Sequence, residues 1–273
     1  MASTDEWTTV TKSSRRCMRN RKREYRSSHS KAAERQQFDQ DNLSLDDIAG
    51  SLQSCLHEVR ISGFFQAFRD SLSSTIASSK EPIVEIVCYG VGNFGASKGC
   101  APMFQLAFTI AVREILSPAA SMYFYDPCMT QQESIVLERN SIQVIAKNER
   151  GRRRVQHKTL FLMPHCPLTL YSNLIRTNWD QLNDVIIFGN LLSAYTSRLG
   201  EVKSCVKLLK QVEPLWDESM LPISKQDLSD RSGQFEQAFN DSSLTHFQTT
   251  RFQDIFQQPP PSLDEKDDGG ETI

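Results

Sequence analysis

The stretch IVEIVCYGVGNFG, residues 83–95, decides the fold of this 273-residue chain. Its first seven residues form a mainly apolar, β-branched run between Pro82 and Gly90, which is typical of a short buried strand. The residues that follow, Gly90-Val91-Gly92-Asn93-Phe94-Gly95, form a GxGxxG pattern. Glycines directly after a strand predict a tight turn at the carboxyl end of a parallel sheet.

The chain around this stretch alternates between short apolar strands and helices. Further strands are predicted over 122–125, 142–146, 159–163 and 185–188. Helices are predicted over 44–77 (one or two), 102–116, 131–140, 168–179 and, as a final pair, 190–209. This alternation predicts an α/β fold, a Rossmann-like doubly wound and mostly parallel sheet of about five strands with helices on both faces.

Charge divides the chain into three parts. Residues 1–35 hold 10 Lys and Arg against 4 Asp and Glu, residues 36–216 hold 17 against 17, and residues 217–273 hold 4 against 12. Few large apolar residues occur near either end, and such segments cannot bury enough surface to offset their ordering entropy. We therefore expect a disordered basic tail over 1–40, an α/β domain over 41–216 and an acidic, mostly disordered tail over 217–273.

Composition and local hydropathy exclude several classes of protein. Residues 1–10 are polar and acidic, so we expect no secretory signal, and the most apolar stretch, 103–112, is about half the length that a membrane span needs. Seven cysteines without an export signal favour free thiols in the cytoplasm, the nucleus or both. Eight positive charges between residues 12 and 26 fit a nuclear address, a weak nucleic-acid contact or a solvated tail; we do not expect direct nucleic-acid binding.

The glycine pattern fits a nucleotide site in part. The next helix is predicted to begin near Pro102, several residues late, and Asp126 follows Gly90 by 36 positions where a dinucleotide fold has about 20. An S-adenosylmethionine-type pocket tolerates both departures, with Gly90, Gly92, Asn93 and Phe94 under the ligand and Asp126 on a ribose. The alternatives are a dinucleotide site and a loop that only shapes the sheet edge.

A second cluster, Met163-Pro164-His165-Cys166-Pro167, lies where the strand 159–163 ends. Because ligands of doubly wound sheets bind outside the carboxyl ends of the strands, His165, Cys166 and Asn190 are expected to converge with Asp126. Cys166 followed by Pro, beside His165, fits haem iron ligation, or a turn with a buried thiol. No paired Cys or His spacing indicates another metal, and His165 is poorly placed as a base for its sequence neighbour.

Six basic side chains surround a turn at Gly151 and form a third candidate. They fit either a phosphate contact at the same edge of the sheet or a solvated hairpin tip. The six residues are Lys147, Arg150, Arg152, Arg153, Arg154 and Lys158.

Five short motifs in order resemble the "sensitivity to red light reduced" family. They are Val87–Phe94, Tyr125-Asp126-Pro127, Leu162–Cys166, Ile187–Asn190 and Asn178-Trp179; Gly95 departs from the family's usual Ser. The resemblance implies a regulator of circadian gene expression and haem biosynthesis, with haem or a nucleotide-type compound as a candidate ligand and with unidentified protein partners. An S-adenosylmethionine-dependent, methyltransferase-like enzyme and a pure interaction module are the alternatives.

Overall fold

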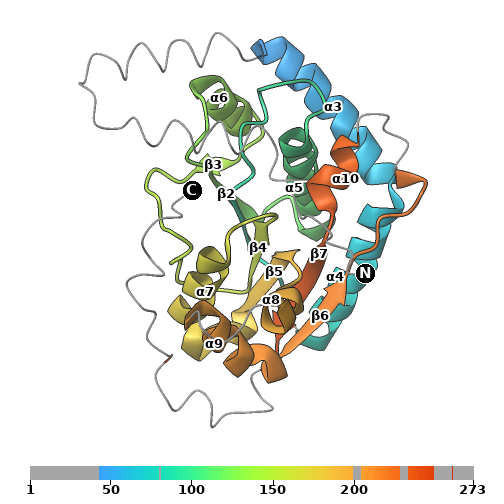
Figure 1. The fold of residues 1–273 in the computed structure, drawn as a ribbon. Helices are drawn as coiled ribbons and strands as arrows, with labels where there is room; N and C mark the ends of the chain where they lie inside the picture. The colour runs from blue at the N-terminus through green and yellow to red at the C-terminus, as the bar shows by residue number, and fades with distance from the viewer. Residues whose placement is uncertain (1–42, 80, 199–203, 228–232, 249–259, 261–273) are drawn as a thin grey trace, which may run out of the picture. The chain divides into compact units, whose positions relative to one another are not determined.

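The structure is a computed structural model that describes residues 43–79, 81–198, 204–227, 233–248 and 260 (Figure 1). The basic tail predicted over 1–40 lies outside the described residues, as does most of the chain after residue 248. The description below therefore concerns the α/β domain.

Five parallel strands form the larger part of the sheet, as the alternation of elements predicted. They are β1(Glu85–Tyr89), β2(Ser121–Tyr125), β3(Gln143–Val144), β4(Thr159–Met163) and β5(Val185–Asn190), and their spatial order is β3-β2-β1-β4-β5. Cys88 in β1 pairs with Phe124 of β2 on one side and with Leu162 of β4 on the other. The predicted α/β, doubly wound, mostly parallel fold is confirmed by this topology.

The sheet continues into a segment that we predicted to be a mostly disordered tail. Strands β6(Trp216–Met220) and β7(Ser242–Phe247) extend the order to β3-β2-β1-β4-β5-β7-β6, with β7 antiparallel to both of its neighbours. The domain boundary at residue 216 was therefore wrong. These strands escaped the sequence reading because their residues are mainly polar, and sequence periodicity measures apolar side chains.

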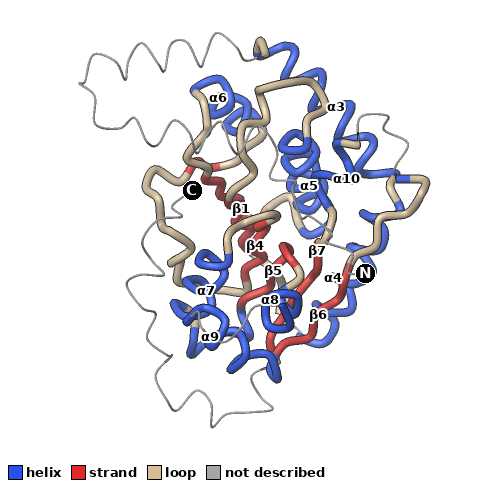
Figure 2. Tube along the Cα trace, viewed as in Figure 1, coloured by secondary structure: helices blue, strands red, loops and turns tan. Residues whose placement is uncertain are grey.

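Helices cover both faces of the sheet (Figures 1 and 2). One face carries α3(Leu45–Ile61), α4(Gly63–Ser79), α5(Ala101–Leu116), α6(Gln131–Arg139) and α10(Gln234–Phe239). The other carries α7(Leu168–Thr177), α8(Leu192–Arg198) and α9(Ser204–Val212), with the 3-10 turns Trp179–Asp184 and Glu213–Leu215. Successive β1 residues alternate between the two cores: Ile86 and Cys88 face the first, Val87 and Tyr89 the second.

Phenylalanine side chains fill the first core and join its distant segments. Phe64 of α4 stacks on Phe239 of α10 with ring centroids 4.8 Å apart. Phe108 of α5 stacks on Phe188 of β5 at 4.6 Å. Offset and edge-to-face ring pairs add stabilisation beyond the area that they bury. The C-terminal α10 is therefore part of the main core.

The helix starts follow from local sequence. The Ser44 hydroxyl accepts a hydrogen bond from the Asp47 amide at 3.2 Å and caps α3. Asp227, far along the chain, caps α4 by accepting from the Gly63 amide at 2.7 Å. The helix predicted over 168–179 ends at Thr177, where the side chain of Asn178 begins to bind backbone groups.

Candidate functional site

The loop after β1 lies at the carboxyl edge of the parallel strands. Gly90 and Gly92 have φ angles of 73° and 88°, in the left-handed region that disfavours any side chain. The Gly90 amide donates to the carbonyl of Tyr125 at 3.2 Å, which holds the loop over the end of β2. The turn that the glycines predicted is present, and it brings the loop next to Asp126.

Asp126 closes this loop. One carboxylate oxygen accepts a hydrogen bond from the Gly92 amide at 2.7 Å, and the other accepts from the Cys128 amide at 2.7 Å. The residue is 5% exposed. Burial raises the pKa of the carboxyl above its usual value, because desolvation outweighs the two amide hydrogen bonds that favour the charged form. Asp126 thus lies where we predicted it, with both oxygens bonded to the chain.

Glu133 is a second buried carboxylate at the same loop, and our sequence reasoning missed it. It accepts from the Gly95 amide at 2.7 Å and from the Thr130 amide at 2.7 Å, while the Thr130 hydroxyl caps α6 in return. Burial also raises the pKa of Glu133. The spacing Thr130-x-x-Glu133 is a capping-box signature, so the sequence did contain the signal that places Glu133 at this helix start.

The other loop residues differ in their surroundings. Phe94 is fully buried and packs edge-on against Phe124 with ring centroids 6.2 Å apart, so its side chain belongs to the core. Asn93 is half-buried beside it. Of the loop residues predicted to lie under a ligand, Gly90, Gly92 and Asn93 remain at the edge itself.

His165 follows β4 at the same edge of the sheet. Its φ is 54°, an uncommon value for a residue with a side chain, and its amide donates to the side-chain oxygen of Asn190 at 2.7 Å. The ring Nε2 lies 3.2 Å from the carbonyl oxygen of Ala238. Partial burial lowers the pKa of the imidazole, although nearby backbone carbonyls oppose the shift. The ring therefore ties the end of β4 to α10.

Cys166 is enclosed on the opposite face of the sheet. It is 2% exposed and its thiol donates to the carbonyl of Tyr89 at 3.4 Å. Burial raises the pKa of this thiol well above its ordinary value, which favours the protonated form. A haem ligand of the cysteine type is a thiolate, so the environment of Cys166 opposes the role that we considered for it.

Asn190 joins the pieces of this edge. Besides accepting from His165, its amide group donates to the carbonyl of Cys166 at 3.1 Å and to the hydroxyl of Tyr195 at 2.7 Å. Its own backbone amide donates to the Tyr171 hydroxyl at 2.9 Å. Asn190 thus fixes the loop after β4 to the end of β5, and the predicted convergence of His165, Cys166 and Asn190 is observed.

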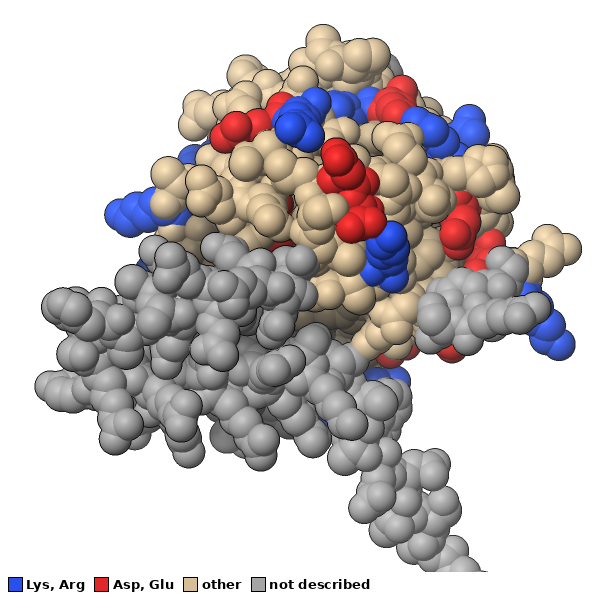
Figure 3. Space-filling view, turned by 90° about the horizontal axis from the view of Figure 1, so that it is seen from above, with Lys and Arg blue, Asp and Glu red and all other residues tan. Residues whose placement is uncertain are grey.

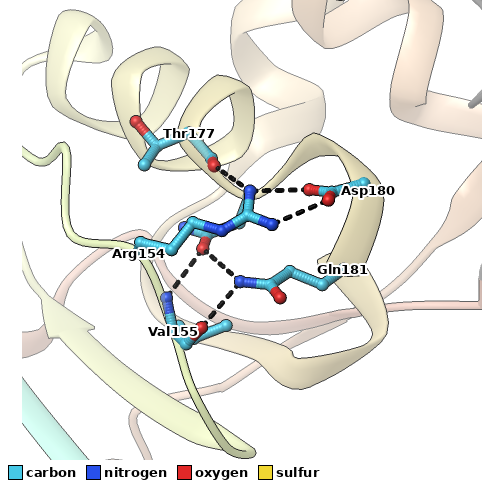
Figure 4. Close-up of polar contacts among 6 residues, drawn as sticks. Arg154, Val155, Thr177, Asp180 and Gln181 are labelled. Carbon is cyan, nitrogen blue, oxygen red and sulfur yellow. Dashed lines mark hydrogen bonds and ion pairs between the residues drawn. The ribbon is translucent and has the colours of Figure 1, made fainter.

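The basic side chains around Gly151 bond to the protein itself. Arg153 contacts Glu149 at 3.0 Å and lies 4.3 Å over the ring of Tyr123. The Arg154 guanidinium donates to both carboxylate oxygens of Asp180 and to the Thr177 carbonyl at the end of α7 (Figure 4). Lys158 is buried and donates to the Asn183 carbonyl at 2.9 Å. These three cations act as structural links, which favours that reading over a phosphate contact.

Asn178 is the residue on which this corner depends. Its side chain is fully buried, accepts from the Val155 amide at 2.9 Å and donates to the carbonyls of Arg153 and Leu174 at 2.9 Å each. We expect Asn178→Ala to lower the free energy of unfolding by about 2–3 kcal/mol, since it leaves buried polar groups unpaired. Urea unfolding measures this difference.

Arg154→Ala is the matched comparison, because Arg154 joins the same corner from the solvent side. The Arg154 and Asp180 side chains are 47% and 62% exposed, so their ion pair is worth about 0–1 kcal/mol. An equal loss for the two variants would contradict the assignment of Asn178 as the central residue.

A family model of the SRR1 domain matches residues 52–246. The chain belongs to the SRR1 family. The matched region runs from α3 through β7, so the SRR1 domain includes the two strands that we had assigned to a tail. It also contains Gly90, Gly92, Asp126, His165, Cys166 and Asn190.

Curated relatives agree with this assignment. Protein SENSITIVITY TO RED LIGHT REDUCED 1 of Arabidopsis thaliana is 29% identical over 230 residues, which cover 78% of this chain and 80% of that protein. An SRR1-like protein of Mus musculus is 38% identical over 137 residues, 46% of this chain and 54% of that protein. An SRR1-like protein of Drosophila melanogaster is 24% identical over 67% of this chain and 63% of its own length.

The solved structure of the 23S rRNA methyltransferase ErmE is similar to the SRR1 domain chain with a TM-score of 0.36 and 13% identity, over 72% of this chain and 70% of that one. A TM-score this low does not establish a common fold. In the described ranges of this SRR1 chain, no three His, Cys, Asp or Glu side chains gather as a metal site, and no helix is long and apolar enough to span a bilayer.

The pKa shifts at the edge predict a pH dependence of SRR1 domain stability. Because Asp126 binds its proton more tightly in the folded state than in the unfolded state, the free energy of unfolding should fall as pH rises from the ordinary aspartate value through the raised one. We expect Asp126→Asn to reduce this fall between pH 4 and 7, and to cost about 1–3 kcal/mol at pH 7 by unpairing one amide.

Urea unfolding at several pH values tests this expectation. The exposed Asp46 in α3 supplies a matched control, Asp46→Asn, which removes an aspartate charge without touching the loop. A pH dependence that is identical in wild type and Asp126→Asn would show that Asp126 is not the group responsible.

Proposed function

We propose that this chain is a regulatory protein that acts by binding a ligand or a protein partner at the carboxyl edge of its sheet. The observation that carries the proposal is the closed loop after β1, whose amides at Gly92 and Gly95 are held by the buried carboxylates of Asp126 and Glu133. Doubly wound sheets bind their ligands at this edge. A loop with fixed backbone conformation is preorganised for binding, which reduces the entropy lost on association.

The bonding of the polar side chains favours regulation over catalysis. His165 bonds to the Ala238 carbonyl, Cys166 to the Tyr89 carbonyl and Asp126 to backbone amides. A nucleophilic enzyme needs its nucleophile and base within hydrogen-bond reach of one another. Here each candidate is bonded to the main chain instead.

We further propose that the regulated processes are those implied by the family: circadian gene expression and haem biosynthesis, in the cytoplasm, the nucleus or both. The name of the Arabidopsis relative, which refers to reduced sensitivity to red light, supports a signalling role. If haem is the ligand, His165 is the better iron ligand, because the Cys166 thiol is buried. Titration with haemin should then give a Soret band that changes in His165→Ala and not in Cys166→Ala.

Complementation of cells that lack the protein tests the proposed role. Gly92→Asp places a side chain at a left-handed position beside Asp126, so we expect it to abolish rescue of rhythmic reporter expression and of haem content. Gly99→Asp is the matched control: Gly99 also has a positive φ in the same loop, but a Cβ there would meet no atom within 4 Å. Equal rescue by both variants would contradict a role for the edge.

A second candidate is a methyltransferase-like enzyme, and the strand order favours it. The order β3-β2-β1-β4-β5-β7-β6 with an antiparallel β7 is also the order of S-adenosylmethionine-dependent methyltransferases. This is an analogy of fold and does not establish an activity. Transfer of a labelled methyl group from S-adenosylmethionine to protein or RNA, lost in Asp126→Ala, would favour the enzyme.

A pure interaction module is the third candidate, and a groove on the other side of the domain favours it. A groove of about 530 Å³ lies between α4 and the β6–β7 edge, and the 64% exposed Met220 lies at its rim. If this surface carries the function, Met220→Glu should abolish rescue in the same assay while Gly92→Asp retains it.

A further inference from the structure

The first turn of α5 has no backbone amide left for a ligand. The Ala101 amide donates to the side-chain oxygen of Gln234 at 3.0 Å, and Pro102 has no amide hydrogen. The amides of Met103 and Phe104 donate to the Cys100 carbonyl at 2.8 and 3.2 Å. Doubly wound folds bind the phosphates of a nucleotide at the start of the helix that follows the glycine loop. In this chain that position is taken by the protein's own groups.

The helix that supplies Gln234 is held firmly in this place. The Gln105 side chain of α5 donates to the Ala238 carbonyl of α10 at 2.9 Å. The rings of Phe104 and Phe235 lie 5.4 Å apart, and Phe239 is fully buried. Figure 1 shows α10 beside the start of α5. A phosphate therefore cannot displace Gln234 without disrupting the core.

The groups left at the edge favour a ligand that donates hydrogen bonds. Each oxygen of Asp126 accepts one amide hydrogen bond, and a carboxylate has room for about four in all. Glu133 adds a second carboxylate close by. Lys and Arg alternate with Asp and Glu on the face seen in Figure 3, the side on which the loop between β1 and α5 lies in Figure 1. An anionic ligand would meet like charges here, whereas hydroxyl groups would meet acceptors.

We infer that the ligand of this edge is a phosphate-free nucleoside with a vicinal diol, and that Gln234 is the residue that excludes phosphorylated nucleotides. Asp126 would accept from the ribose hydroxyls, as an acidic residue after the second strand does in related sheets. The inference rests on the proposed function, because it names the ligand class of the same edge.

Calorimetric titration of the full chain with adenosine and AMP tests the inference, since the two compounds differ only by the phosphate. We expect adenosine to bind at least tenfold more tightly than AMP, and Asp126→Asn to weaken adenosine binding at least tenfold while circular dichroism shows a folded chain. Gln234→Ala should reduce the preference for adenosine over AMP. Gln237→Ala, in the same helix, should leave that preference unchanged.

The outcomes separate this inference from the proposed function. AMP binding as tight as adenosine binding would overturn the inference, and so would an unchanged preference in Gln234→Ala. If adenosine does not bind but haemin binds in a manner sensitive to Gly92→Asp, the inference fails and the proposed function stands. If no compound binds in a manner sensitive to Gly92→Asp, a ligand function fails with it.

Discussion

A chain that stops after Leu215 should fail to fold, although a reading of the sequence alone would place only a tail beyond that point. The truncation removes β6, α10 and β7, and with them the buried side chains of Phe235, Phe239, Leu244 and Phe247. Each large apolar side chain contributes about 1.5–3 kcal/mol on burial, so the total loss is comparable to the whole stability of a domain, about 5–15 kcal/mol. Removal would also expose Phe64 and Phe188 in the first core.

A chain that stops after Gln248 is the matched control, because it keeps all of the strands that the structure describes. We expect it to show a cooperative thermal transition by circular dichroism and to elute as a compact species. The chain that stops after Leu215 should show neither property. A cooperative transition of the shorter chain, within a few degrees of the longer one, would contradict the assignment of β6 and β7 to the core.

Gly189→Ala should be the most damaging single substitution at the sheet edge. A Cβ at this position would lie 2.5 Å from the Tyr171 hydroxyl oxygen and 3.0 Å from the Met163 carbonyl oxygen. Overpacking of this kind costs about 1–3 kcal/mol, and displacement of the Tyr171 hydroxyl, which donates to Met163 and accepts from Asn190, adds about 1 kcal/mol for each bond lost. Chemical denaturation measures the sum.

Two further variants make this prediction specific. Tyr171→Phe removes the hydroxyl that the new methyl group would strike, so the double variant should be less destabilised than the sum of the two single variants. Gly50→Ala in α3 places a methyl group in open space, and we expect it to stabilise the helix by up to about 1 kcal/mol. Additive losses in the double variant would show that the hydroxyl is not the obstacle.

The parallel part of the sheet could be predicted because its signals are local. Each of β1, β2, β4 and β5 is a short apolar run, and strands that are buried on both faces have that composition. The sequence WDESM of β6 and SSLTHF of β7 has no such run. These strands are stable because Glu218 accepts from the hydroxyls of Ser243 and Thr245 and from amides at the start of α8. Satisfaction of polar groups by distant partners is a property of the fold and is not visible in a short window of sequence.

The same distinction applies to the candidate site. Gly90, Gly92 and Asp126 could be placed at one edge because each directly follows a recognisable strand. Gln234 is 133 positions from the Ala101 amide that it caps, and no local pattern announces such a contact. The environment of Cys166 was also hidden, because a Cys-Pro dipeptide does not reveal that the thiol is buried against Tyr89.

The most direct test of the proposed function is a thermal-shift screen of the purified chain with haemin, S-adenosylmethionine, NAD(P) and ATP, repeated on Gly92→Asp and Gly99→Asp. A ligand at about 100 times its dissociation constant adds roughly 2.7 kcal/mol to the stability of the folded state. We predict that a compound without phosphate raises the melting temperature of the wild type and of Gly99→Asp but not of Gly92→Asp. A shift that is equal in all three proteins, or no shift with any compound, would contradict a ligand site at this edge.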